Sequence, residues 1–99
     1  MTEYNLVYSE TSRNLIAKLH PDIKPLIRSK LNKLQKEPFS GKTLERELSG
    51  YRSIRTGRFR IIYRLNEEKR IIEIHYVGRR KDVYELFTEQ KGTSSVLDG

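Results

Sequence analysis

The stretch GYRSIRTGRFRIIYRL (Gly50–Leu65) holds two runs of alternating side-chain character, separated by the triplet TGR. Alternation with a period of two is typical of β-strands, because successive side chains of a strand point to opposite faces of the sheet. We therefore expect one strand over Tyr51–Arg55, a tight turn that contains Gly57, and a long strand over Phe59–Leu65. The two strands form a hairpin.

A third strand is expected over Arg70–Val77, after the polar turn NEEK (residues 66–69) and before Gly78, which ends it. Three strands joined by short turns predict an antiparallel meander. A short helix over Arg79–Phe87 follows the meander in this interpretation.

The residues before the meander predict a strand and two helices. YNLVY (Tyr4–Tyr8) has the aromatic and branched composition of a strand, and Ser9 or Thr11 can cap the helix after it. The prolines of HPDIKP (residues 20–25) break that helix, and a second helix is expected over about Ile23–Lys36. The apolar stripe of the second helix consists of Ile23, Leu26, Ile27, Leu31 and Leu34.

Together these elements predict an α+β fold. An antiparallel sheet, made of the N-terminal strand and the three-strand meander, is expected to pack on an N-terminal helix hairpin, with a short C-terminal helix at the end. A chain of 99 residues suits one domain. We assign residues 1–88 to this domain and residues 89–99 to a flexible C-terminal tail.

The alternation also sorts the sheet side chains onto two faces. In the long strand, Phe59 and every second residue after it are expected to pack on the helices, while Arg60, Ile62 and Arg64 point to the other, open face. If Ile54 belongs to the core, Arg55 joins Arg60 on the open face.

The third strand allows two assignments. In the first, Ile72, Ile74 and Tyr76 belong to the core. Glu73 and His75 then lie on the open face. The reverse assignment stays open, because two residues of the other parity are also apolar.

The net charge of the chain favours negatively charged partners. Twenty Lys and Arg against thirteen Asp and Glu give a net charge of +7, which attracts phosphate backbones and acidic proteins. The chain has no cysteine, and its two histidines lack ligand spacing, so the sequence indicates no metal site and no cofactor. The N-terminus lacks the blocks of a signal peptide, and no apolar run approaches the ~20 residues of a membrane-spanning helix. We expect a cytoplasmic protein that does not bind membranes.

Arginines are concentrated around the predicted hairpin, which holds five of them. The short turn brings Arg55 close to Arg60. Arg80 lies at the start of the last helix, and Tyr84 follows one turn later on the same helix face. These four side chains can converge on one positive, partly aromatic patch.

Such a patch can bind RNA, and it can also cleave RNA. Guanidinium groups match phosphate oxygens, and a tyrosine ring can stack on an exposed base. When a ribose 2′-hydroxyl attacks its own phosphate, negative charge develops on the phosphoryl oxygens, and fixed guanidinium groups lower the barrier. The product is a 2′,3′-cyclic phosphate. The simpler alternative is a solvated arginine-rich face that carries no site.

The base that accepts the 2′-hydroxyl proton is left open by the sequence, because a guanidinium is a poor base near neutral pH. An imidazole is better suited, and the chain has His20 and His75. Carboxylate alternatives are Glu45, Glu47 and Glu73. His75 is the first candidate because it can reach the open face, and a purely structural histidine is the alternative.

At these residues the chain resembles the RelE/ParE superfamily of toxins from type II toxin–antitoxin systems, and it is most similar to the RelE-like mRNA interferases. The most specific parts are LSGYRSIRTGRFRIIYRL (Leu48–Leu65) and VGRRKDVYEL (Val77–Leu86). The resemblance begins at YNLVYSETS (Tyr4–Ser12) and covers nearly the whole chain. It implies an antiparallel sheet with a helix hairpin on one side.

The resemblance also implies a function and partners. A RelE-like toxin is an endoribonuclease that enters the ribosomal A site, cuts mRNA there and inhibits translation. A cognate acidic antitoxin, RelB-like and encoded beside the toxin, silences it in a hetero-oligomeric complex. The alternative within the superfamily is a ParE-like toxin, which binds and inhibits DNA gyrase without nuclease chemistry.

Roles for four residues follow from the resemblance. Arg60 stands where the family has an arginine that contacts the scissile phosphate. Arg80 matches an arginine proposed to protonate the leaving oxygen. Tyr84 matches a tyrosine that stacks on or orients the substrate, and Arg55 matches a basic position.

Two departures from RelE concern the base. Tyr51 and Ser53 stand where RelE has lysines, one of which is its proposed base, and His75 stands where RelE is apolar. The candidate catalytic set is therefore Arg55, Arg60, Arg80, Tyr84 and His75.

Overall fold

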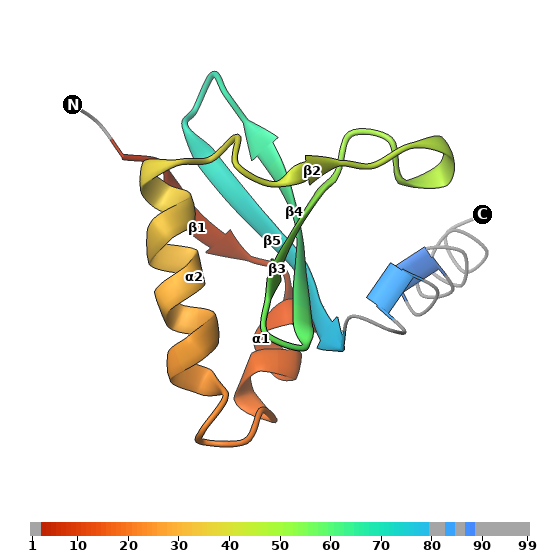
Figure 1. The fold of residues 1–99 in the computed structure, drawn as a ribbon. Coiled ribbons are helices and arrows are strands. Elements are labelled where there is room, and N and C mark those ends of the chain that lie inside the picture. The colour runs from red at the N-terminus through yellow and green to blue at the C-terminus, as the bar shows by residue number, and fades with distance from the viewer. Residues whose placement is uncertain (1–2, 80–82, 85–86, 89–99) are drawn as a thin grey trace.

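The computed structural model describes residues 3–79, 83, 84, 87 and 88, and shows a twisted sheet with two helices packed on one face (Figure 1). The elements in chain order are β1 (Asn5–Tyr8), α1 (Glu10–Ala17), α2 (Lys24–Lys36), β2 (Lys42–Thr43), a 3₁₀ helix (Arg46–Leu48), β3 (Arg52–Thr56), β4 (Phe59–Asn66) and β5 (Ile71–Arg79). This arrangement confirms the α+β class, the helix hairpin and the three-strand meander.

The sheet has the strand order β1-β5-β4-β3-β2 and is mixed. The meander β3-β4-β5 is antiparallel, as expected, but β1 lies parallel to β5, with Asn5 opposite Ile71. No short turn joins β1 to β5, so local sequence patterns do not determine their relative direction. The fifth strand, β2, was not expected, because its two residues are too few to show an alternating pattern.

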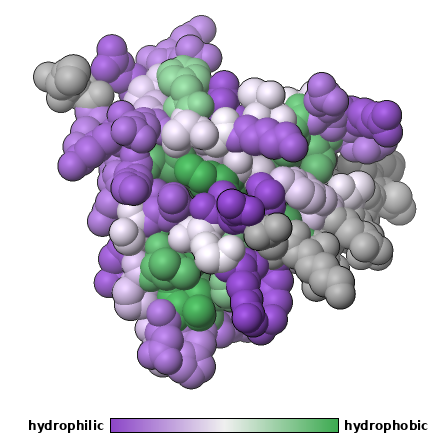
Figure 2. Space-filling model, in the orientation of Figure 1, coloured by the Kyte–Doolittle hydropathy of each residue, from purple (hydrophilic) through white to green (hydrophobic). Residues whose placement is uncertain are grey.

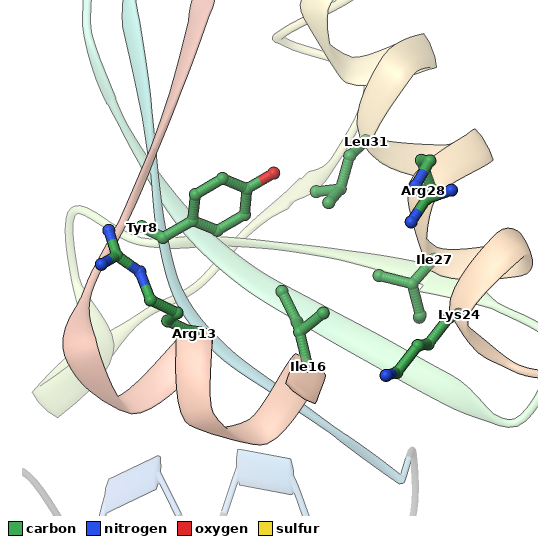
Figure 3. A pocket seen from close by; sticks show the side chains of 7 residues that line it. All are labelled: Tyr8, Arg13, Ile16, Lys24, Ile27, Arg28 and Leu31. Carbon is green, nitrogen blue, oxygen red and sulfur yellow. The ribbon is translucent and has the colours of Figure 1, made fainter. Parts of the chain in front are cut away.

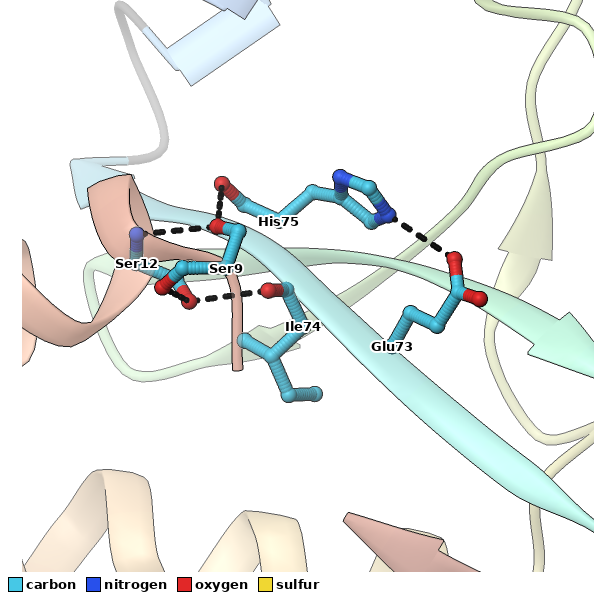
Figure 4. Close-up of polar contacts among 5 residues, drawn as sticks. All are labelled: Ser9, Ser12, Glu73, Ile74 and His75. Atoms are coloured by element: carbon cyan, nitrogen blue, oxygen red, sulfur yellow. Dashed lines mark hydrogen bonds and ion pairs between the residues drawn. The ribbon is translucent and has the colours of Figure 1, made fainter. Parts of the chain in front are cut away.

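The start of α1 is joined to β5 by serine hydroxyls (Figure 4). The N-cap is Ser9, whose Oγ accepts a hydrogen bond from the Ser12 backbone N–H at 3.1 Å. Ser12 is fully buried, and its Oγ lies within hydrogen-bond distance of the Ser9 carbonyl and of the Ile74 carbonyl, at 2.8 Å from the latter. The sequence prediction of Ser9 as a cap is confirmed. The contacts with β5 anchor α1 to the sheet.

The main core lies between the helices and the sheet. Ile27, Leu31 and Leu34 of α2 pack against Ile61 and Tyr63 of β4, and none of the five is more than 4% exposed. This confirms which face of β4 points to the helices.

One residue of the predicted α2 stripe lies outside this core. Leu26 is 41% exposed, and its side chain lies beside Gly57 in the turn between β3 and β4. Figure 2 shows apolar surface over the helix hairpin, surrounded by hydrophilic side chains. The two helices also leave an open pocket beside β1 (Figure 3).

Tyr63 joins the main core to the loop after α2. Its hydroxyl donates to the Pro38 carbonyl at 3.1 Å and accepts from the Gly41 N–H at 2.9 Å. Burial raises the pKa of the Tyr63 hydroxyl, although the Gly41 hydrogen bond and the charge of Arg52 oppose this. A Cβ atom at position 41 would overlap the Tyr63 hydroxyl, so glycine is required there.

The second face of the sheet is only partly open. A second apolar cluster covers it at Ile62, which is fully buried. The buried members of this cluster are Leu48, Tyr51, Ile62, Tyr76, Val83 and Phe87. The sequence prediction placed Ile62 on this face correctly, but it did not foresee that residues of the C-terminal segment would cover it.

A β-bulge explains the mixed faces of β5. Ile62 is opposite Tyr76, but its neighbour Tyr63 is opposite Ile74, so His75 is an extra residue in β5. Ile72 and Ile74 therefore face the helices as expected, whereas Tyr76 belongs to the second cluster. The expectation that Tyr76 shares the core face of Ile74 is wrong, because the bulge shifts the alternation by one residue.

The end of β5 and the C-terminal segment also differ from the prediction. β5 continues through Gly78, which pairs with Arg60, and ends at Arg79. Val83, Tyr84, Phe87 and Thr88 are helical, in line with a C-terminal helix. Arg80 and the predicted tail at 89–99 lie outside the described residues. In the part of the chain that the structure describes, no helix is long and apolar enough to span a bilayer.

Candidate functional site

The register of the meander places the basic side chains on the second face. Arg55 of β3 lies directly opposite Arg60 of β4, and Ser53 lies opposite Ile62 in the next row. Directly opposed residues of an antiparallel pair share a face, so the two arginines are neighbours, as the hairpin pattern predicted. Arg55 is exposed and Arg60 is half-buried.

Ser53 joins Arg60 to Tyr84 on this face. Its Oγ accepts a hydrogen bond from Arg60 Nη1 at 3.1 Å and another from the Tyr84 hydroxyl at 3.0 Å. The Arg60 guanidinium carbon lies 5.4 Å from the centroid of the Tyr84 ring, which is cation–π geometry. Ser53 is 1% exposed, so its hydroxyl is a fixed acceptor shielded from water.

We call Ser53, Arg55, Arg60 and Tyr84 the arginine–tyrosine cluster. Two like charges directly opposite each other repel, and no carboxylate forms an ion pair with either arginine among residues 3–79, 83, 84, 87 and 88. A bound anion would relieve this repulsion. The cluster is therefore suited to holding a phosphate beside a tyrosine ring.

His75 belongs to a different group of side chains. Its Nε2 lies 3.2 Å from Glu73 Oε1 (Figure 4), and its ring packs edge-on against Tyr51 with centroids 5.1 Å apart. Phe87 lies on the same ring at 6.4 Å, and the Arg64 guanidinium stacks on Tyr51. The structure thus places His75 on the second face, as the first assignment expected, but packs it among other residues than the arginine–tyrosine cluster.

The carboxylates named as possible bases occupy different places. Glu45 lines a hollow of about 480 Å³ that Tyr84 also lines, next to Leu44 and Leu48. Glu73 is paired with His75. Glu47 is an exposed residue of the 3₁₀ helix.

The other histidine, His20, lies in the turn between the helices. Its Nδ1 accepts a hydrogen bond from the Asp22 backbone N–H at 3.1 Å. Within the residues that the structure describes, no three His, Asp or Glu side chains gather as metal ligands would.

The sequence prediction of the site can now be compared with the structure. The structure brings together three of the five candidates, Arg55, Arg60 and Tyr84. His75 lies in the neighbouring group, and Arg80 lies outside the described residues. The central residue, Ser53, was noted only as a departure from a lysine. The only signal for Ser53 in the sequence was a small polar side chain between Tyr51 and Arg55 on the same strand face.

In sequence, the chain is similar to known toxins of toxin–antitoxin systems. The sequence profile described as ParE toxin of type II toxin–antitoxin system, parDE, matches residues 7–84. Toxin RelG from Mycobacterium tuberculosis is 35% identical over 83 residues, which span 82% of this chain and 95% of RelG.

Solved structures with the same fold include toxin–antitoxin complexes. A chain of the RelBE2 complex from Mycobacterium tuberculosis is 34% identical, with a TM-score of 0.74, and the match covers 79% of this chain and 99% of that chain. A chain of the intact E. coli RelBE complex is 20% identical, with a TM-score of 0.68 and coverage of 77% and 95%. The second likeness concerns the fold alone.

Proposed function

The chain belongs to the RelE/ParE superfamily of toxins from type II toxin–antitoxin systems, and from this premise we propose that it is an endoribonuclease that cleaves mRNA on the ribosome in the cytoplasm. The observation that carries this proposal is the pairing of Arg60 with the Tyr84 ring through one buried acceptor, Ser53 Oγ. A fixed guanidinium beside an aromatic platform matches a phosphate next to an unstacked base.

The reaction we propose uses the nucleophile of the substrate itself. The ribose 2′-oxygen attacks the adjacent phosphorus, the bond from phosphorus to the 5′-oxygen breaks, and the product carries a 2′,3′-cyclic phosphate. Arg60 and Arg55 stabilise the charge on the phosphoryl oxygens. Tyr84 orients the base or the ribose, and Arg80 donates a proton to the leaving 5′-oxygen.

Two residues of the chain are candidates for the base that accepts the 2′-hydroxyl proton. Glu45 lines the hollow beside Tyr84, so its carboxylate is placed to take the 2′-hydroxyl proton from a substrate bound there. His75 is a better base by type, but its ring packs against Tyr51 and lies near Phe87, with Nε2 on Glu73. The contacts therefore favour Glu45, and His75 is the second candidate.

The cognate antitoxin is the partner we propose for the same face. The solved relatives include complexes with RelB antitoxins. The net charge of +7 and the opposed arginines fit an acidic, RelB-like chain, which would cover the cluster in a hetero-oligomeric complex.

The decisive experiment is single-turnover cleavage of mRNA on programmed ribosomes by the wild type and Arg60→Ala. We expect the variant to lose about 10²–10³-fold in rate with ribosome-bound substrate saturating, since it removes one charge-assisted donor to the transition state. Arg58→Ala, in the exposed hairpin turn, is the matched control and should cleave as the wild type does. Equal rates for the wild type and Arg60→Ala would contradict the proposal.

A second candidate function is inhibition of DNA gyrase, because the matching family profile is named for ParE. Mapping of RNA 5′ ends after expression separates the two. Cuts within codons support the nuclease. Intact mRNA together with gyrase-linked DNA breaks supports the ParE-like activity.

A further inference from the structure

A pocket of about 320 Å³ opens between the helix hairpin and β1, on the side of the sheet that the helices cover (Figure 3). Tyr8 enters it from β1, and Arg13 and Ile16 enter it from α1. The remaining lining residues lie on α2 and are Lys24, Ile27, Arg28 and Leu31. None of these side chains belongs to the arginine–tyrosine cluster.

Helix periodicity accounts for this composition. Lys24, Ile27, Arg28 and Leu31 are spaced so that all four share one face of α2, and Arg13 and Ile16 share one face of α1 in the same way. The turn between the helices makes these two faces meet. The aliphatic side chains form the floor, where Ile27 is 1% exposed, and the cationic side chains form the rim.

The rim carries an uncompensated positive charge. In Figure 3, Lys24 and Arg28 lie on α2 at one side of the pocket, and Arg13 lies on α1 at the other side, beyond Tyr8. Across the part of the chain that the structure describes, no carboxylate forms an ion pair with any of the three cations. Burial raises the pKa of the Tyr8 hydroxyl, and the positive charge of Arg28 opposes this rise. The Arg28 guanidinium is therefore close enough to act on the Tyr8 hydroxyl electrostatically.

We propose that this pocket binds a small phosphate ester with a planar apolar body, of the class of the nucleoside monophosphates. Lys24 and Arg28, one turn apart on the same face of α2, match a phosphate dianion better than the single charge of a carboxylate. The aliphatic floor and the Tyr8 ring supply the apolar surface that a base needs. The volume of the pocket lies at the lower end of the range of small-ligand sites, which suits one nucleotide.

This site goes beyond the proposed cleavage of mRNA, and neither depends on the other. It lies on the helix side of the sheet and shares no residue with the arginine–tyrosine cluster. A nucleotide in the pocket would touch β1, α1 and α2 at once. By binding only the folded chain it would raise the stability of the toxin as its concentration rises.

The test is a titration of the isotope-labelled full-length chain with adenosine 5′-monophosphate, followed by amide NMR shifts. We expect saturable shifts at Arg13, Ile16 and Arg28. Inorganic phosphate alone and adenosine alone should each bind at least about tenfold more weakly, because each offers half of the recognised chemistry. Arg28→Ala should raise the Kd about 10- to 100-fold, the equivalent of one lost charge-assisted hydrogen bond.

Lys33→Ala supplies the matched control, because it removes one positive charge from an exposed position of α2 that does not line the pocket. It should leave the Kd within about twofold of the wild type, since an exposed charge contributes little. Shifts confined to the residues around Ser53 would overturn the proposal by assigning the nucleotide to the cleavage site. Equal affinity for phosphate alone, an unchanged Kd in Arg28→Ala, or binding of an acidic peptide but not the nucleotide would also overturn it.

The cleavage assay keeps the two proposals apart. Arg28→Ala should cleave ribosome-bound mRNA at the wild-type rate, whatever its affinity for the nucleotide. A chain that cleaves mRNA but fails the titration refutes the pocket alone, and the converse refutes the nuclease alone.

Discussion

At the scale of single residues, Ser53 connects the sheet to the C-terminal segment. One hydroxyl accepts from a guanidinium of β4 and from a phenol of the residues after β5. Ser53→Ala leaves both donors without this acceptor. We expect the cleavage rate of bound substrate to fall about tenfold or more, with little change in KM, since Arg60 and Tyr84 would lose their relative placement.

Ser53→Thr tests positioning against simple packing, because threonine keeps the acceptor. It should retain more of the turnover than Ser53→Ala. Turnover that is unchanged in Ser53→Ala, with the fold intact by circular dichroism, would show that the hydroxyl does not position the pair.

The proton acceptor is a second question at this scale. We expect the pH–rate profile of single-turnover cleavage to keep its shape in His75→Ala, because the His75 ring packs against Tyr51 and its Nε2 lies on Glu73, outside the arginine–tyrosine cluster. The same variant should lose stability on the order of 1 kcal/mol through the lost ring contacts. Glu45→Gln should instead lower the rate and change the profile. The opposite pattern would identify His75 as the base.

The arginine–tyrosine cluster also shows how far the sequence alone can predict the site. Arg55 and Arg60 could be placed together because a short turn sets the register of their strands. The contact between Ser53 and Tyr84 joins residues that are 31 positions apart and depends on how the C-terminal segment packs. No local pattern encodes that packing, so the sequence placed Tyr84 near the arginines but did not identify their common acceptor.

At the scale of secondary-structure elements, periodicity predicted most helices and strands, and distant pairing determined the exceptions. The hairpin β3–β4 follows from alternation around Gly57, which has a φ of 60° in the turn. The parallel pairing of β1 with β5 and the bulge at His75 arise only when segments far apart in the chain come together. The alternating pattern of β5 could not reveal the bulge, because the extra residue, His75, is compatible with either face of the sheet.

The junction of α1 with β5 is an element-scale feature that can be tested by stability. Ser12→Ala removes a fully buried hydroxyl and leaves the Ile74 carbonyl without that partner. We expect a loss of about 1–3 kcal/mol in the free energy of unfolding by urea. Ser29→Ala, on an exposed position of α2, is the matched control and should change stability by less than about 0.5 kcal/mol. A Ser12→Ala chain as stable as the control would show that the buried bond contributes nothing.

At the scale of the whole molecule, the buried phenol of Tyr63 and the half-buried phenol of Tyr8 link stability to alkaline pH. Burial raises the pKa of Tyr8 and of Tyr63 in the folded chain. As the pH rises above about 10, the unfolded chain loses these protons first, so unfolding is favoured and stability falls. Below that range their contribution should stay constant.

The measurement is the urea midpoint of the wild type and of Tyr8→Phe between about pH 9 and pH 11. Tyr8→Phe should show a smaller alkaline loss, since one of the two phenols can no longer ionise in the unfolded chain. Parallel curves for the two proteins would refute this linkage for Tyr8.

The parallel pairing of the first strand with the last has a consequence for how the protein is made. A nascent chain that has emerged only as far as β4 lacks the strand to which β1 pairs, and it lacks the carbonyl that holds Ser12. The sheet therefore cannot form completely until β5 has been synthesised. A product cut short before β5 would therefore lack both the strand that pairs with β1 and the Tyr84 hydroxyl that completes the arginine–tyrosine cluster.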